Sequence, residues 1–239
     1  MFNDKPLDGK VALITGASRG IGLAIARSLA AMGMKIGLCA RDAERVHSVA
    51  AELERQGASV VAVAGDLARP GDIAPIVRKT EQSFGPIEIL INNAGIGYFG
   101  PTHEASEENW DTVLDTNLKS VFLLSRAVVP GMIAHHGGQI VNIASLAGKN
   151  AFAGGGIYCA SKWGLLGLTQ CMAEDLRPHG IRVSAVCPGS VATDFSPHGG
   201  KDPRKMLEPE DVAHAVTMIL TQASGSFISE VLLRPTQKP

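Results

Sequence analysis

Short apolar runs alternate with longer segments in which apolar residues recur at helical spacing, along almost the whole chain of 239 residues. The first run, Val11 to Ile14, leads into a glycine cluster, and the segment from Ile21 to Met32 then carries apolar residues on one helical face. A continuous apolar run of this length is typical of a strand buried on both faces of a parallel sheet. The predicted order is therefore strand, turn and helix.

The same alternation continues to the C-terminus. Further strands are expected at residues 35–40, 59–64, 87–91, 139–143, 183–186 and 228–233. Helices are expected at residues 43–56, 73–84, 156–176 and 209–221, and helical patterns also run through 110–135, interrupted or bent near Pro130. We therefore expect one α/β domain over residues 1–239, a Rossmann-type doubly wound sheet of about seven parallel strands with its ligand at their carboxyl ends.

Composition and charge narrow the classes of function. The net charge of -1 and the pI near 6.7 give no electrostatic footprint for nucleic acid or an anionic membrane. No apolar run approaches the roughly 20 residues of a membrane helix, and the polar N-terminus lacks the layout of a secretory signal, so we expect the cytoplasm. The four cysteines form no C-x-x-C pair and no cluster with histidine, which predicts free thiols and no metal site.

A glycine-rich turn lies between the first strand and the first helix. It reads Thr15-Gly16-Ala17-Ser18-Arg19-Gly20-Ile21-Gly22. Glycines here permit a tight turn and close approach of the backbone to a pyrophosphate, whose charge the helix N-terminus favours. The spacing differs from the common G-x-G-x-x-G, but the position after the first strand predicts a dinucleotide site.

Two arginines indicate which dinucleotide is bound. The second strand leads into Arg41 with no carboxylate before Asp42, whereas an NAD site usually has an acidic residue there to hold the ribose. Arg19 and Arg41 can clamp a 2′-phosphate, so NADP(H) is expected, although either alone would fit an ordinary surface position.

The loops after the third and fourth strands complete the expected cofactor site. Asp66 suits either the adenine amino group or a turn cap, and Leu67 suits packing on the ring. The residues Asn92-Asn93-Ala94-Gly95 suit a backbone that bends sharply beside the cofactor.

Tyr158 and Lys162 stand four residues apart in a segment expected to be helical, and Ser145 precedes them after the fifth strand. This spacing places both side chains on one helical face, and an ammonium near a phenol lowers the phenol pKa. A hydroxyl from Ser145 could hold a carbonyl oxygen against that phenol, so the set predicts carbonyl reduction. Taken singly, Tyr158 and Lys162 would be exposed helix residues and Ser145 a cap.

Taken together, these motifs carry a resemblance to a known family. They are TGASRGIG at 15–22, NNAG at 92–95, Asn117, Ser145, Y-x-x-x-K at 158–162 and Pro188-Gly189. In this order they resemble the short-chain dehydrogenase/reductase family, and the resemblance covers essentially the full chain. It implies that Tyr158 gives its proton to the carbonyl oxygen, which Ser145 orients. It also implies that Lys162 holds the nicotinamide ribose and lowers the tyrosine pKa, while Asn117, at a bend in its helix, holds a water linking Lys162 to solvent.

The resemblance and the residue patterns together predict the cofactor contacts. They are Gly16, Ser18, Arg19, Gly20, Ile21, Gly22, Arg41, Asp66, Leu67, Asn93, Ala94, Gly95, Tyr158, Lys162, Pro188, Gly189, Val191 and Thr193. Val191 and Thr193 are included because family members often contact the nicotinamide carboxamide at this place.

The substrate is expected to lie against the segments that follow the later strands. Their apolar candidates are Tyr98, Phe99, Leu146, Phe152 and Phe195, which favour an apolar or mixed carbonyl compound. The segment from Phe195 to Leu207, rich in Gly, Pro, Lys and Asp, suits either a substrate lid or a passive surface loop.

Within the family, the chain resembles 3-oxoacyl-(acyl-carrier-protein) reductases, which implies a 3-oxoacyl thioester or a related 3-oxo compound as substrate. Those enzymes tend to present arginines to the acidic carrier where this chain has His136 and His179, so a general ketone or 3-hydroxy-acid reductase is equally open. A non-catalytic NADP sensor or scaffold is a further alternative.

The resemblance also implies a homodimer or homotetramer through the helices at 106–135 and 156–177. Their faces carry Leu118, Val121, Leu124, Trp163, Leu166 and Gln170. The same residues could instead face the sheet.

Overall fold

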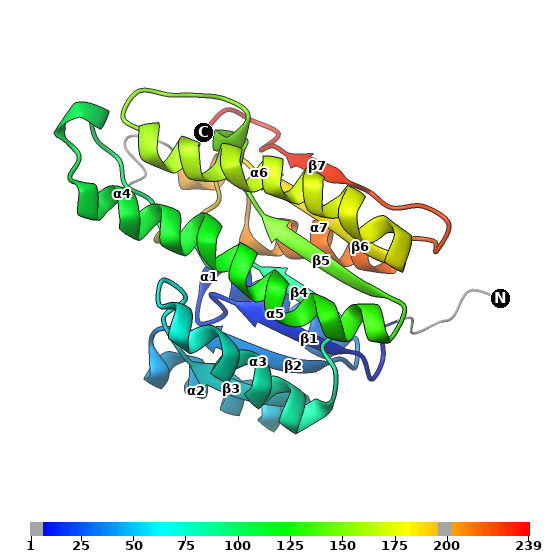
Figure 1. Ribbon diagram of the computed structural model, residues 1–239. Helices are drawn as coiled ribbons and strands as arrows, with labels where there is room; N and C mark the ends of the chain where they lie inside the picture. The colour runs from blue at the N-terminus through cyan, green and yellow to red at the C-terminus, as the bar shows by residue number, and fades with distance from the viewer. Residues whose placement is uncertain (1–6, 196–201) are drawn as a thin grey trace.

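A seven-stranded parallel sheet forms the centre of the computed structural model, which describes residues 7–195 and 202–239 (Figure 1). Its strands are β1 (Val11–Thr15), β2 (Lys35–Ala40), β3 (Ser59–Ala64), β4 (Ile89–Asn92), β5 (Gly138–Ile143), β6 (Ile181–Pro188) and β7 (Glu230–Leu233). Their order is β3-β2-β1-β4-β5-β6-β7. All carboxyl ends therefore lie at one edge of the sheet, with the topological switch point between β1 and β4.

Helices cover both faces of the sheet. They are α1 (Gly20–Ala31), α2 (Ala43–Arg55), α3 (Pro70–Phe84), α4 (Glu107–Leu114), α5 (Ser120–Ala134), α6 (Gly156–Leu176) and α7 (Pro209–Thr221). α1, α2 and α7 pack on one face, and α3, α5 and α6 on the other (Figure 1). The expected doubly wound α/β fold is confirmed. No helix in the described part of the chain is long and apolar enough to cross a membrane.

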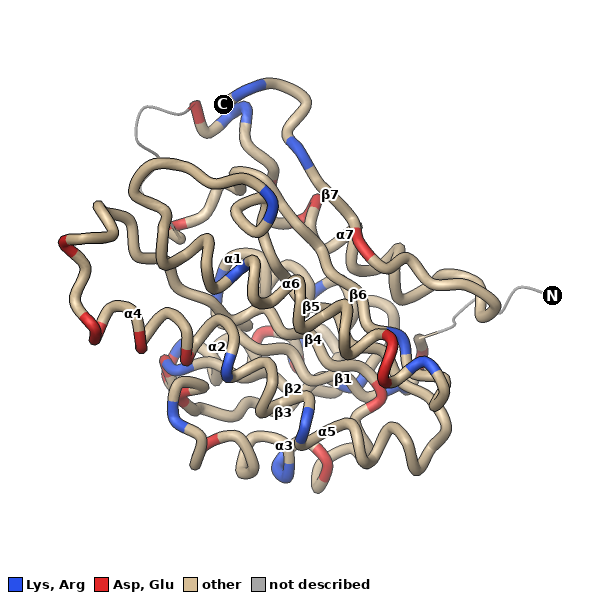
Figure 2. The backbone as a smooth tube through the Cα atoms, turned by 45° about the horizontal axis from the view of Figure 1, so that its top comes forward, with Lys and Arg blue, Asp and Glu red and all other residues tan. Residues whose placement is uncertain are grey.

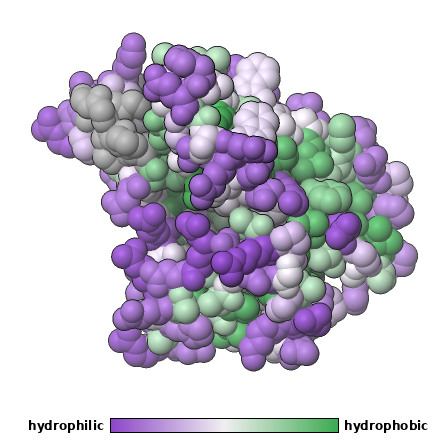
Figure 3. Space-filling model, turned by 60° about the vertical axis from the view of Figure 1, so that its left-hand side comes forward, coloured by the Kyte–Doolittle hydropathy of each residue, from purple (hydrophilic) through white to green (hydrophobic). Residues whose placement is uncertain are grey.

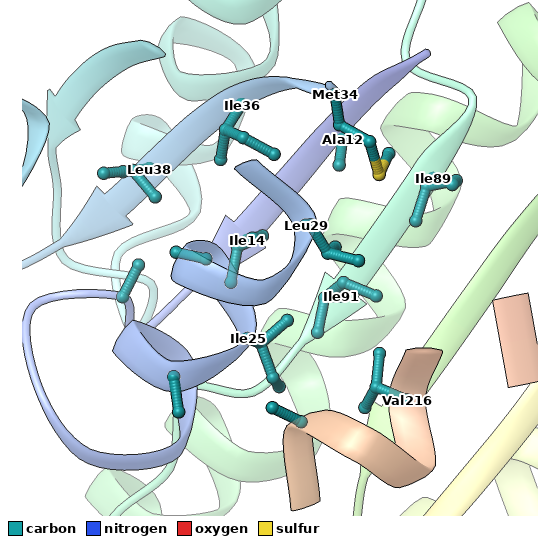
Figure 4. Close-up of a cluster of buried hydrophobic side chains, with 14 of the residues drawn as sticks. Ala12, Ile14, Ile25, Leu29, Met34, Ile36, Leu38, Ile89, Ile91 and Val216 are labelled. Atoms are coloured by element: carbon teal, nitrogen blue, oxygen red, sulfur yellow. The ribbon is translucent and has the colours of Figure 1, made fainter. Parts of the chain in front are cut away.

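Each face of the sheet has its own apolar core. On one face, Ile14 and Ile36 of the sheet pack with Ile25 and Leu29 of α1 and Val216 of α7 (Figure 4). On the other face, a second cluster joins the sheet to α3, α5 and α6. Strands covered on both faces cannot alternate apolar and polar residues, which explains the continuous apolar runs in the sequence.

Polar caps fix where several helices begin. Asp42 accepts a hydrogen bond from the backbone N–H of Arg45 at 3.0 Å, which starts α2. α7 begins at Pro209 within a capping box made by Glu208 and Asp211. These contacts satisfy N–H groups that the first helical turn leaves unpaired.

The predicted interruption near Pro130 is wrong, because α5 continues through Pro130, which lies at an exposed position inside the helix. The irregular turn lies earlier, where the π-helical segment Asp115–Lys119 joins α4 to α5 and buries Thr116 and Asn117. Single π-helical turns of this kind often occur at functional sites.

Candidate active site

A cavity of about 1400 Å³ opens at the carboxyl ends of the strands. It runs from the loops after β1, β2 and β3 to the loops after β4, β5 and β6. Figure 3 brings this side of the molecule forward and shows hydrophilic residues over much of it. The predicted cofactor residues line the cavity with the exception of Gly22, and Ser145 lines it as well, whereas Asn117 lies behind the wall.

Close backbone packing explains the glycines of the first loop. Gly16 has a φ of +64°, and a Cβ there would lie 2.9 Å from the Cα of Ala94. Gly22 lies behind Gly16, where a Cβ would collide with the Gly16 carbonyl oxygen, so it shapes the loop without lining the cavity. Asn93 also supports the loop, because its amide donates to the carbonyls of Thr15 and Gly16 at 2.9 and 3.2 Å.

Thr15, the first residue of the glycine turn, was not among the predicted site residues. Its hydroxyl oxygen accepts hydrogen bonds from the backbone N–H groups of Asn93 and Ala94, both at 3.0 Å. The same hydroxyl donates to the carbonyl of Ile91 at 3.3 Å. Thr15 therefore joins the loops after β1 and β4, and a hydroxyl at the end of an otherwise apolar strand was the signal for it.

Guanidinium groups gather at the β1–β2 end of the cavity. Arg19 lies 3.2 Å from the carboxylate of Asp194, and both side chains are exposed. Arg41 is exposed and has no ion-pair partner within the described residues. Arg45, which the sequence analysis did not select, also lines the cavity and pairs with Asp42 at 3.1 Å. Its signal was its place one helical turn after Arg41.

The residues at this end fit a dinucleotide. Asp66 lines the cavity, and one of its carboxylate oxygens accepts a hydrogen bond from the Ala68 N–H at 3.1 Å. The second oxygen, which lies 4.0 Å from Arg69 Nε, can still accept a hydrogen bond from a ligand. The volume of the cavity is larger than the roughly 300–1,000 Å³ that is common for small-molecule sites, as a dinucleotide together with a substrate would require. A Cβ at Gly95 would lie 3.3 Å from Asn117 Oδ1 and 3.7 Å from Lys162 Nζ, so glycine keeps this part of the floor open.

Tyr158, Ser145 and Lys162 meet on the wall of the cavity. Tyr158 and Lys162 lie on one face of α6, and both are buried, with exposed fractions of 8% and 3%. Ser145 accepts a hydrogen bond from the Ala147 N–H at 3.0 Å, so it is indeed a cap. Because a hydroxyl can donate and accept at once, Ser145 also hydrogen-bonds the phenol of Tyr158.

Lys162 is held by the main chain of β5. Its ammonium donates to the carbonyl of Ile143 at 2.8 Å, and Nζ lies 5.9 Å from the centroid of the Tyr158 ring. Burial disfavours the charged form and lowers the pKa of Lys162 from 10.5 to about 8.

The expected lowering of the Tyr158 pKa is wrong for this structure. Burial raises the pKa of Tyr158 to about 12, and the hydrogen bond from Ser145 lowers it only in part. The Lys162 ammonium donates its hydrogen bond to the Ile143 carbonyl, and its Nζ lies 5.9 Å from the centroid of the Tyr158 ring. The phenol is therefore protonated at neutral pH.

Asn117 fixes the floor between these groups. Its amide oxygen accepts from the Ile96 N–H at 2.8 Å, and its amide nitrogen donates to the Ile96 carbonyl at 2.8 Å and to Ser161 Oγ at 3.0 Å. Ser161 in turn donates to the Tyr158 carbonyl at 2.7 Å. The side chain of Asn117 is thus fixed by protein groups, and the water expected from the resemblance stays a prediction.

Aromatic rings surround the mouth of the cavity. Phe99, Phe152 and Phe195 line it, whereas Tyr98 does not. Of the expected lid, residues 196–201 lie outside the described part of the chain. The chain on the two sides of this segment is joined, because the Ala192 N–H donates to the Leu207 carbonyl at 2.8 Å.

Fold and site together define a dinucleotide-binding oxidoreductase. A family model described as short chain dehydrogenase matches residues 10–203. The chain belongs to this family.

Individual relatives agree with this assignment. A protein of Streptomyces violaceoruber, named as a candidate ketoacyl reductase of the granaticin polyketide synthase, is 46% identical over 78% of this chain and 69% of its own length. The 3-oxoacyl-[acyl-carrier-protein] reductase of a Synechocystis strain is 35% identical over 93% of this chain and 94% of its own. A metagenomic short-chain oxidoreductase solved in complex with NADP is 45% identical, covers 97% of this chain and 100% of its own, and superposes with a TM-score of 0.86.

Proposed function

We propose that this protein is an NADP(H)-dependent reductase that converts a ketone to a secondary alcohol. The observation that carries the proposal is the meeting of Tyr158, Ser145 and Lys162 on the wall of a cavity whose far end is lined by the glycine loop and arginines. The NADP bound by the metagenomic relative supports the cofactor, as do Arg19 and Arg41 without an acidic residue at the end of β2.

The site residues have distinct parts in this reaction. Bound NADPH supplies the hydride for the carbonyl carbon. The hydroxyls of Ser145 and Tyr158 donate to the carbonyl oxygen and stabilise its developing charge. Tyr158 is protonated at neutral pH and supplies its proton to that oxygen. Lys162, fixed by the Ile143 carbonyl, stabilises the phenolate that remains after proton transfer.

Replacement of the acid tests the proposal. Tyr158→Phe removes the proton and keeps the ring, so we expect NADPH affinity within about twofold of wild type and a loss of kcat of at least about 10³-fold. The measurement is NADPH oxidation with a panel of ketones, β-keto esters and 3-oxoacyl thioesters, with NADH compared in parallel. Tyr98→Phe is the matched control, because Tyr98 is the other tyrosine of the chain and does not line the cavity.

Three outcomes would contradict the proposal. Substantial activity in Tyr158→Phe would exclude this acid, and a clear preference for NADH would exclude the cofactor assignment. NADPH binding without turnover of any carbonyl by wild-type protein would favour the non-catalytic sensor instead.

A 3-oxoacyl thioester is the second candidate substrate. The names of the Streptomyces and Synechocystis relatives favour it. Against it, His136 and His179 are exposed where carrier-binding arginines are expected, and they precede β5 and β6 at the edge of the sheet opposite this chain's own cavity. The ketone panel distinguishes the two by the relative kcat/KM of free ketones and thioesters.

Assembly and location form part of the same proposal. We infer a homodimer or homotetramer through the outer side of α4, α5 and α6, where Trp110, Phe122 and Trp163 are exposed. We also infer a reducing compartment such as the cytoplasm, since all four cysteines are unpaired and three of them are buried.

A further inference from the structure

Two phenylalanine rings pack against the ring of Tyr158, and a third packs against one of these two. Phe99, Phe152 and Phe195 are termed the phenylalanine rim below. The ring centroids of Phe99 and Phe195 each lie 5.6 Å from that of Tyr158, with interplanar angles of 58° and 52°. Phe152 lies 6.4 Å from Phe99. These separations and tilts are those of favourable aromatic pairs.

The phenylalanine rim is apolar and yet exposed. The exposed fractions of Phe99, Phe152 and Phe195 are 38%, 48% and 40%. Single exposed phenylalanines need no explanation, but three that line one cavity form a patch of the kind found at ligand sites. The rings come from the separate loops after β4, β5 and β6, so only the fold brings them to one place.

Charged side chains lie at the other end of the cavity. Arg19, Arg41 and Arg45 follow β1 and β2, whereas the phenylalanine rim follows β4, β5 and β6. On the rim side, the charged residues of the lining are Lys162, which is buried and bonded to a carbonyl, and Asp194, which pairs with Arg19. A carboxylate or phosphate on the substrate would find no free cation among the described residues there.

We propose that the substrate is an uncharged ketone with an aromatic ring attached to its carbonyl carbon. The inference rests on the proposed function and specifies its substrate. With the carbonyl oxygen at the hydroxyls of Ser145 and Tyr158, a ring on the carbonyl carbon lies beside Phe99 and Phe195, which already pack against the phenol ring, and Phe152 extends this apolar surface. An aryl ketone is nearly planar and rigid, so it loses little conformational freedom on binding.

The reaction balances as a two-electron reduction. The carbonyl carbon gains a hydride and forms a C–H bond, while NADPH is oxidised to NADP⁺. The carbonyl oxygen gains the phenol proton of Tyr158, and one proton from solvent restores the phenol. The products are the benzylic secondary alcohol and NADP⁺.

A pair of ketones with the same skeleton tests the inference. Acetophenone and cyclohexyl methyl ketone differ only in saturation of the ring, and conjugation makes the first less electrophilic, so a preference for it has to come from binding. We expect kcat/KM for acetophenone to exceed that for cyclohexyl methyl ketone by about tenfold. Phe99→Leu and Phe152→Leu should each reduce this ratio by about fivefold, mainly through KM.

Phe227→Leu is the matched control. Phe227 stacks on Arg177 and does not line the active-site cavity, so the ratio should stay unchanged. A third substrate, the N-acetylcysteamine thioester of 3-oxobutanoate, represents the carrier-bound class. Activity with all three substrates is measured as NADPH oxidation at equal enzyme concentration.

Each contrary result identifies what has failed. A ratio near one, a ratio unaffected by both rim variants, or a preference of more than about tenfold for the thioester over acetophenone overturns the aromatic assignment and leaves the reductase proposal intact. Absence of NADPH oxidation with all three compounds overturns the proposed function and this inference with it.

Discussion

Burial shifts the pKa values of Tyr158 and Lys162, the two residues on the inner face of α6. Lys162 is almost fully enclosed, and its pKa falls from 10.5 to about 8. A change of this size corresponds to about 3 kcal/mol against the charged form. Since the folded-state pKa lies below the unfolded value, the destabilisation is fully present below about pH 8 and disappears as the pH rises to 10.5.

Removal of this charge should stabilise the fold while it destroys function. We expect Lys162→Met to raise the free energy of unfolding at pH 7 by about 1–3 kcal/mol, less the lost hydrogen bond to Ile143. The gain should shrink at pH 10, where the lysine is largely neutral in the folded state. Urea unfolding at both pH values measures it, and kcat with any accepted ketone should fall sharply.

Lys119→Met is the control for this prediction. Lys119 is exposed and pairs with Asp115 at 3.1 Å, so its loss should change stability by less than about 0.5 kcal/mol at either pH. If Lys162→Met instead lowers the stability at pH 7, the hydrogen bond to the β5 carbonyl outweighs the desolvation of the ammonium.

At the scale of elements, the loops after β1 and β4 form one unit at the switch point of the sheet. The amide of Asn93 and the hydroxyl of Thr15 tie the two loops together, and Gly16 allows them to touch. The β1 loop faces the cofactor end of the cavity, and the β4 loop leads to the floor beside Lys162. The geometry of one loop therefore depends on the other.

A comparison of alanine substitutions at two glycines with positive φ can distinguish the effect of a steric contact from the effect of backbone strain. Gly16 has a φ of +64° and lies against Ala94, whereas Gly57 has a φ of +89° and no atom within 4 Å of its added Cβ. We expect Gly57→Ala to lower stability by about 1 kcal/mol and leave NADPH affinity unchanged. Gly16→Ala should lower stability by at least about 1 kcal/mol more and weaken NADPH binding by at least about tenfold.

Urea unfolding and NADPH fluorescence titration provide the two measurements. Equal effects of Gly16→Ala and Gly57→Ala on both quantities would show that the contact with Ala94 does not shape the cofactor site.

At the scale of the whole molecule, charge and hydrophobicity are distributed differently. Basic and acidic residues are interspersed over the described chain (Figure 2), whereas hydrophobic residues gather on the right-hand side of Figure 3, toward the α5–α6 face. Val121, Leu124 and Leu166 do not contribute to this surface, because they are buried within a single chain and face the sheet. Phe122 and Trp163 are exposed at 46% and 53%.

A charge on this surface should separate the protomers. Trp163→Glu places a carboxylate where an apolar contact is proposed, so we expect the variant to sediment as a monomer while wild-type protein sediments as a dimer or tetramer. Met218→Glu is the control, because Met218 is 42% exposed on α7, at the opposite face of the sheet. A monomeric wild type, or dissociation to monomers by Met218→Glu alone, would contradict this interface.

The sequence by itself determined the order of the elements and singled out residues that the fold brings to one cavity. Residues 35–40 and 59–64 were predicted to the residue. A strand buried on both faces of a parallel sheet requires a continuous apolar run, as in β2, whereas β3 lies at the edge of the sheet and is only partly buried. The glycine loop and the Y-x-x-x-K spacing are local patterns, because a turn and a single helix fix which of their residues share a face.

Only the tertiary structure decided what depends on burial and on contacts between distant segments. It raised the pKa of Tyr158 because the folded chain buries the phenol, with Phe99 and Phe195 from two separate loops packed against its ring. It showed that the bend expected at Asn117 is the π-helical segment Asp115–Lys119, from which Asn117 bonds to Ile96 across the site. Solvent exclusion and long-range hydrogen bonds have no local period, so no sequence pattern records them.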